Sequence, residues 1–115
     1  MTDDTGLPLP SQRCVACEGG TPPLPKDQAQ ELYAQLPSGW TLGGLVIEKT
    51  FTFPTFPEAI AFVDRVAELA ESEGHHPDLD IRYRRVTVHL TTHAIKGLSR
   101  NDFILAAKIE ALRSH

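Results

Sequence analysis

The stretch that decides the fold is Leu79-Asp80-Ile81-Arg82-Tyr83-Arg84-Arg85-Val86-Thr87-Val88-His89-Leu90. Apolar and polar side chains alternate on both sides of Arg84-Arg85, a pattern typical of two half-buried strands in a hairpin. If Arg84-Arg85 is a two-residue turn, Ile81 faces Val88 and Leu79 faces Leu90, so that the apolar residues of both strands lie on one face. Arg-Arg is poor chemistry for such a turn, which favours Asn-Gly, and a longer loop would shift the register.

Two more strands and three helices are predicted around this hairpin. The strands are Trp40–Leu42 and Leu45–Phe53, and the helices are Lys26–Leu36, Thr55–Glu73 and Ser99–Leu112. Thr55 and Glu58 form a capping box at the start of the second helix, and Gly74 is a natural C-terminal cap. The order α-β-β-α-β-β-α predicts an α+β fold, in which helices pack on one face of a four-stranded antiparallel sheet.

The second helix has an unusually broad apolar surface. Its apolar stripe consists of Phe56, Ile60, Val63, Ala67 and Ala70, widened by Phe62, Val66 and Leu69. A surface this wide is more than one sheet can cover, which favours a homodimer or homotetramer.

Length and composition predict one domain with a modest core, because 115 residues with 41% hydrophobic and 23% charged side chains are typical of soluble globular proteins. Residues 1–24 are rich in proline and glycine, so we expect an N-terminal arm there and the folded domain in residues 25–115. No apolar run reaches the roughly 18 residues of a membrane-spanning helix, and the acidic start Met1-Thr2-Asp3-Asp4 is not a secretory signal. The net charge of −4 argues against nucleic acid as a direct partner. These features together predict a cytoplasmic protein without a membrane partner.

The arm contains the two cysteines of the chain, Cys14 and Cys17. One Cys-x-x-Cys supplies only two of the four ligands that a structural zinc needs, so a zinc site would require histidines from elsewhere or from a second subunit. A thioredoxin-like motif would lie between a strand and a helix, whereas this one lies among prolines and glycines. Reduced thiols without a catalytic role are the favoured interpretation, and metal binding and redox chemistry stay open.

Three of the five histidines, His75, His76 and His93, lie at the polar ends of the predicted elements. Continuing the hairpin register places His76 opposite His93. Glu71 lies four residues before His75, a spacing that stacks the two side chains if the last helical turn is regular. Asp102 returns to the same end of the sheet through a short loop. The expected result is a cluster of imidazoles with carboxylates beside it.

Each of these residues also has an ordinary structural explanation. Histidines at a helix C-terminus can interact with the helix dipole, and an acidic residue in a first turn can do the same. Imidazole is also a zinc ligand, although the spacing here is not that of a local zinc motif. General acid–base catalysis fits best, because two imidazoles can serve as one acid and one base near neutral pH. No phosphate loop or dinucleotide fingerprint is present, so the residues predict a small lyase, isomerase or dehydratase and leave the substrate open.

In these residues and their spacing the chain resembles the pterin-4a-carbinolamine dehydratase family. The family motif is an acidic residue, three residues, His-His-Pro, five residues, an aromatic residue, nine residues and His, with Asp further on. The matching positions are Glu71, His75-His76-Pro77, Tyr83, His93 and Asp102. Further matches are Gly39-Trp40, Thr91-Thr92 and Gly97-Leu98. The resemblance covers about residues 24–112, and the arm around the cysteines also resembles that of bacterial members.

The resemblance implies a reaction and a role for each residue. Family members remove water from 4a-hydroxytetrahydropterin (4a-hydroxytetrahydrobiopterin), giving a quinonoid dihydropterin during tetrahydrobiopterin recycling for aromatic amino acid hydroxylases. His75 and His93 would exchange protons with the 4a-hydroxyl and with N5, and His76 would hold the pterin and assist. Glu71 and Asp102 would orient the imidazoles. The pterin is the substrate, and neither a cofactor nor a metal is implied.

Two departures and one alternative function accompany this resemblance. Leu79 stands where some relatives carry Trp, so an aromatic wall of the pocket is not expected, and Arg84-Arg85 replaces an Asn-containing turn. Some family members act as a dimerisation cofactor for a homeodomain transcription factor or in rubisco assembly, which makes a non-catalytic interaction module the alternative. Members that have drifted into assembly roles tend to lose the His-His pair, which this chain keeps.

Overall fold

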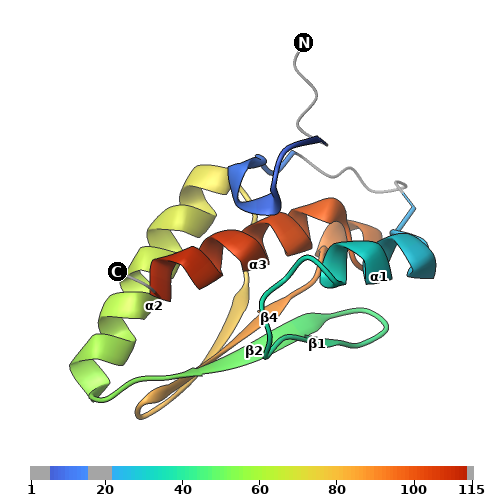
Figure 1. The fold of residues 1–115 in the computed structure, drawn as a ribbon. Coiled ribbons are helices and arrows are strands. Elements are labelled where there is room, and N and C mark those ends of the chain that lie inside the picture. The colour runs from blue at the N-terminus through green and yellow to red at the C-terminus, as the bar shows by residue number, and fades with distance from the viewer. Residues whose placement is uncertain (1–5, 16–21, 114–115) are drawn as a thin grey trace.

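The protein was analysed as a computed structural model, which describes residues 6–15 and 22–113 (Figure 1). The helices are α1 (Lys26–Tyr33), α2 (Phe56–Glu73) and α3 (Arg100–Arg113), and the strands are β1 (Thr41–Leu42), β2 (Ile47–Thr52), β3 (Asp78–Arg82) and β4 (Arg85–Leu90). Two short 3-10 turns are η2 (Leu9–Ser11) and η3 (His93–Ile95). None of the helices in the described ranges is long and apolar enough to cross a membrane.

The strands form one antiparallel sheet in the order β1-β2-β4-β3, and all three helices cover the same face of it (Figure 1). The predicted α+β architecture is therefore confirmed. Helix α3 lies between α1 and α2 in the helical layer, and nearly all of its residues from Asn101 to Ile109 are buried. The core between the layers is built around Phe51, Phe62 and Phe103, each with no exposed surface.

The hairpin exists, but its predicted register is wrong by two residues. Ile81 pairs with Val86 and Leu79 with Val88, because the turn is formed by Tyr83 and Arg84 instead of Arg84-Arg85. A shift by two leaves every side chain on its predicted face, so apolar alternation cannot distinguish the two registers. Turn contacts decide between them.

The observed turn places Tyr83 in the left-handed region, with φ of 54°. An aromatic residue rarely adopts this conformation, and here its ring stacks on Phe56 at a centroid distance of 6.3 Å. The Arg84 guanidinium lies 5.3 Å from the Tyr83 ring centroid, and the Arg84 carbonyl accepts a hydrogen bond from the Phe53 amide at 2.9 Å. These tertiary contacts explain why standard turn preferences misplace the register.

Helix α2 begins and ends as predicted. The Thr55 hydroxyl accepts a hydrogen bond from the Glu58 amide, and Gly74 ends the helix in a left-handed conformation with φ of 68°. The buried stripe is Ala59, Phe62, Val66 and Ala70. Phe56 and Ala67, which were predicted to lie on the core stripe, are exposed on its flank. Helix α1 is three residues shorter than predicted, because the chain from Ala34 to Leu36 continues in tight turns instead of α-helix.

The N-terminal arm lies against α3 over the residues that the structure describes. Leu9 is 2% exposed and belongs to the main core, and the buried Gln12 side chain accepts a hydrogen bond from Arg100 Nε at 2.7 Å. Cys14 follows and is half-buried. Cys17 lies outside the described residues.

Candidate active site

A cavity of about 240 Å³ lies where α2 ends and α3 begins. It contains all three predicted histidines, which reach it from two separate segments: His75 and His76 follow α2, and His93 follows β4. The full lining is Val15, Gly74, His75, His76, Thr91, Thr92, His93, Ala94 and Asn101. The left-handed cap at Gly74 turns the chain towards the cavity directly before the two histidines.

The centre of the site is a hydrogen-bonded pair of His75 and Asp102. His75 Nε2 lies 2.6 Å from Asp102 Oδ1, and the side chains are 11% and 0% exposed. An ionised carboxylate can only accept hydrogen bonds. Nε2 of His75 therefore carries the proton, and Nδ1 of neutral His75 has an electron pair with which to accept another.

The other oxygen of Asp102 is held equally firmly. Asp102 Oδ2 accepts from the Thr92 hydroxyl at 2.8 Å and from the Ser99 amide at 2.9 Å. Since the Thr92 hydrogen is used on Asp102, the Ser99 hydroxyl must be the donor in its 2.7 Å bond to Thr92 Oγ1. The chain of donors runs from Ser99 through Thr92 to Asp102, and it fixes the carboxylate before any ligand arrives. Asp102 also fulfils its predicted role at the helix start, because its side chain reaches back to the Ser99 amide.

His76 and Glu71 form a second, exposed pair. His76 Nε2 lies 2.9 Å from Glu71 Oε1, with side chains 62% and 82% exposed. The prediction that Glu71 stacks on His75 is wrong, because the left-handed Gly74 ends the helix before His75 and turns it away from the helical face. Glu71 is not among the described residues that line the cavity.

His93 lies in the 3-10 turn η3 rather than in β4. Its side chain is 75% exposed, and Nε2 is 3.6 Å from Asp78 Oδ2. The predicted position directly opposite His76 is wrong for the same reason as the hairpin register: in the observed pairing, His89 is opposite Asp78, and the strand ends at Leu90. His93 nevertheless reaches the cavity, because η3 folds the chain back from the end of the sheet.

Several residues of this site were not found from the sequence. Val15 and Asn101 line the cavity, and Ser99 and Asp78 contact the Asp102 network and His93. A detectable signal existed only for Ser99, whose spacing to Asp102 marks a helix start. Nothing in the local pattern around Val15 predicts contact with a residue 86 positions away.

The half-buried Cys14 thiol lies beside the site. Burial raises the pKa of Cys14 to about 12, and the negative charge of Glu73 acts in the same direction. Burial also acts to raise the pKa of Glu73, but hydrogen bonds from Lys108 and from the Cys14 amide overcome it and lower that pKa. A thiol with so high a pKa is a poor nucleophile. Within residues 6–15 and 22–113, no group of three or more His, Cys, Asp or Glu side chains is placed to hold a metal ion.

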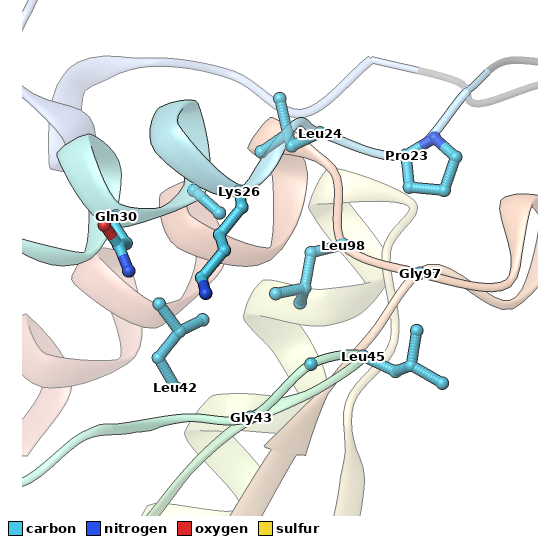
Figure 2. A pocket seen from close by; sticks show the side chains of 11 residues that line it. Pro23, Leu24, Lys26, Gln30, Leu42, Gly43, Leu45, Gly97 and Leu98 are labelled. Atoms are coloured by element: carbon cyan, nitrogen blue, oxygen red, sulfur yellow. The ribbon is translucent and has the colours of Figure 1, made fainter.

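A second cavity, of about 450 Å³, lies between the start of α1, the β1–β2 loop and residues 97–98 (Figure 2). Its lining is mostly apolar, and Lys26 is the one charged side chain among the described residues that line it. Figure 2 shows the Lys26 amine reaching towards Leu42. The described lining carries no histidine or carboxylate, so this cavity lacks the proton-exchanging side chains that line the smaller one.

Comparison with known proteins gives consistent results. Residues 22–112 match the family model described as pterin 4 alpha carbinolamine dehydratase. A protein of Nitrosomonas eutropha provisionally named pterin-4-alpha-carbinolamine dehydratase is 47% identical over 104 residues, covering 90% of this chain and 92% of that protein. A protein of Nitrosospira multiformis with the same provisional name is 44% identical and covers 96% of both chains.

Two solved structures are also similar. A transcriptional coactivator/pterin dehydratase from Brucella melitensis superposes with a TM-score of 0.73 at 33% identity, covering 78% of this chain and 97% of that chain. A pterin dehydratase-like protein described as a RuBisCO assembly factor of the alpha-carboxysome superposes with a TM-score of 0.56 at 26% identity, covering 64% and 88%.

Proposed function

This chain belongs to the pterin 4 alpha carbinolamine dehydratase family, and we propose that it removes water from a 4a-hydroxytetrahydropterin in tetrahydropterin recycling. The proposal rests on one observation: a single cavity is lined by two imidazoles in different environments. His75 is buried and fixed by Asp102, and His93 is exposed on the opposite segment.

The reaction needs one proton donor and one proton acceptor. The C4a–O bond breaks, the leaving hydroxyl takes a proton and departs as water, and N5 loses its proton as the C4a=N5 double bond forms. No net electron transfer occurs, so the reaction needs no redox cofactor. Two histidines of opposite protonation can carry both steps.

The two environments favour different roles. His75, with its proton held on Nε2, accepts the N5 proton at Nδ1, and the resulting imidazolium is stabilised by the ionised Asp102. His93, exposed to water and near Asp78, donates to the leaving hydroxyl and is reprotonated from solvent. His76 holds the pterin and assists, and Glu71 orients His76 rather than His75.

The direct test is the rate of carbinolamine dehydration by the purified protein, with and without a chelator. The carbinolamine is generated in the assay by a hydroxylase or by rapid mixing, and quinonoid product formation is followed by absorbance. We expect acceleration over the spontaneous reaction that the chelator does not change. A rate equal to the spontaneous one would remove the proposal, and loss of activity with chelator would point to a metal instead.

An interaction module on the same fold is the second candidate, because apolar side chains remain exposed. Phe56 is 46% exposed, Ile81 42% and Tyr83 69%, and the three lie on α2, on the edge strand β3 and in the turn that follows it. The names of the two similar structures point to coactivator and assembly roles for those proteins. A partner role would persist in a His93→Ala variant, whereas dehydration would not.

The same exposed surface supports a homodimer or homotetramer. Among the described strands, edge strand β3 has one unpaired side, and apolar residues next to it on α2 remain uncovered. Replacing Ile81 by Lys should shift the mass measured by light scattering towards the monomer. An unchanged mass would place the assembly surface elsewhere.

A further inference from the structure

We propose that the N-terminal arm is part of the pterin site, with Val15 as an apolar wall for the substrate ring and Asn101 as the residue that positions it. This inference rests on the proposed function, because it names a substrate contact for that reaction. It assigns a role to a segment that the acid–base mechanism does not use.

The side chains that line the cavity favour Val15 as the apolar wall. Among the described residues that line it, only Val15 and Ala94 contribute wholly apolar side chains, and the other side chains are histidines, threonines and an asparagine. A pterin ring system binds best when an apolar surface covers part of one face and its polar edge meets hydrogen-bonding groups. Val15 has the larger apolar side chain of the two, and it is 70% exposed.

The Asn101 side chain holds the backbone of Val15 in place. Asn101 Oδ1 accepts a hydrogen bond from the Val15 amide at 2.9 Å, and Asn101 Nδ2 donates to the Val15 carbonyl at 2.5 Å. Asn101 itself is only 3% exposed. A buried amide thus uses both of its functional groups to fix the backbone of one exposed residue, and a loose tail would not require this.

Neighbouring contacts tie the arm to α2 and α3, next to the acid–base residues. The Cys14 amide donates to Glu73 Oε1 at 2.9 Å, and Glu73 Oε2 is paired with Lys108 at 2.7 Å. Glu73 is the last residue of α2, two positions before His75, and Asn101 directly precedes Asp102. The wall and the proton-transfer groups therefore belong to one connected unit.

The experiment compares four single variants and one double variant by kcat, KM and the affinity for 7,8-dihydrobiopterin as a stable ring analogue. Val15→Ala removes two methyl groups from the wall and should raise KM and the dissociation constant about five- to tenfold, with kcat changed less than about twofold. Val15→Ile keeps the apolar surface and should retain the wild-type KM. Leu45→Ala is the matched control, because Leu45 is also exposed, at 64%, but lines the other cavity.

Asn101→Ala tests the positioning role. It should raise KM by a similar factor, and the Val15→Ala/Asn101→Ala double variant should be no worse than either single variant, since both remove the same wall. A purely structural role of Asn101 would instead lower the melting temperature and add its effect to that of Val15→Ala. Thermal unfolding of every variant is recorded for this reason.

The outcomes separate this inference from the proposed function. An active wild type whose KM and analogue affinity stay within about twofold in Val15→Ala overturns the role of the arm and leaves the dehydratase function intact. A wild type that neither accelerates dehydration nor binds the analogue overturns both. A raised KM in Val15→Ala, rescue in Val15→Ile and an unchanged Leu45→Ala support the wall.

Discussion

The two sides of the histidine cavity differ in almost every physical property. On one side, the side chains of His75 and Asp102 are 11% and 0% exposed and are joined at 2.6 Å. On the other side, His93 and Asp78 are 75% and 67% exposed and are separated by 3.6 Å. The first pair is largely buried, with Asp102 fully enclosed, and the second is a loose contact at the surface.

Under the proposed function, substitutions in this site should separate effects on stability from effects on catalysis. A buried carboxylate with three donors is fixed before the substrate binds, and removing it disturbs the fold as well as the chemistry. An exposed imidazole contributes little to folding and exchanges protons readily with water. Substitutions on the two sides should therefore leave different signatures.

Asp102→Ala should have the largest combined effect on stability and turnover. It leaves the Ser99 amide, the Thr92 hydroxyl and Nε2 of His75 without their acceptor, so we expect a loss of about 3 kcal/mol in the free energy of unfolding. Turnover should fall at least about a hundredfold, because neither the tautomer nor the imidazolium of His75 is stabilised. Denaturant unfolding and the dehydration assay measure the two losses.

Asp102→Asn should separate the loss of turnover from the loss of stability. The amide can keep the shape of the network, but its NH₂ group would face Nε2 of His75 and favour the tautomer with the proton on Nδ1. We expect a much smaller loss of stability, about 1 kcal/mol, with a similar loss of turnover. Turnover near the wild-type value in the Asp102→Asn variant would show that the tautomer of His75 is not important.

His93→Ala should follow in size and differ in kind. We expect turnover to fall by about 10²- to 10⁴-fold, while the free energy of unfolding changes by less than about 0.5 kcal/mol, because the side chain is exposed. His89→Ala is the matched control: His89 lies on β4 and pairs with Glu48 at 2.6 Å, outside the cavity. Equal activity of the two variants would contradict the role of His93.

The positions of His75 and Asp102 are easier to predict from the sequence than those of the exposed residues of the cavity. Asp102 was located by its position in a helix start, and His75 by the helix cap at Gly74, both of which depend on local interactions. The position of His93 relative to β3 depends on the hairpin register, and that register is supported by contacts of the turn such as the stacking of Tyr83 on Phe56. Such a contact between distant residues leaves no periodic signal in the chain.

The Val15–Asn101 contact was missed for a related reason. Proline and glycine predict an arm without long regular elements, but they carry no information on what the arm packs against. Leu9 and Gln12 are buried although the composition around them is that of a loop. The arm therefore had to be seen in three dimensions.

Glu73→Gln tests whether the stabilising polar contacts on the His75–Asp102 side of the cavity extend to the end of α2. The pKa of Glu73 is lowered in the folded protein, so its contribution to stability is present above the ordinary glutamate pKa of 4.5 and is lost as the pH falls through the lower folded value. We expect Glu73→Gln to be less stable than wild type by about 1 kcal/mol at pH 7, since the pair with Lys108 still reaches solvent.

Unfolding of both proteins between about pH 7 and pH 3 measures this contribution. The difference in stability should shrink as the pH falls below 4.5 and be smallest at the acidic end. Glu68→Gln, an exposed position on the same helix, serves as the control and should show no such pH dependence. A difference that grows on acidification would contradict the sign.

Glu71→Gln should have the smallest effect, although Glu71 is only two residues from Glu73. Its side chain is 82% exposed and pairs with His76, which is 62% exposed, so solvent and salt screen the interaction. We expect turnover and KM within about threefold of wild type, and a difference that becomes smaller as the ionic strength rises. A tenfold or larger loss that persists at high salt would mean that Glu71 is shielded from solvent when the pterin is bound. Glu71 would then belong with Asp102 on the fixed side of the cavity, and the contrast between the two sides would hold only for the free protein.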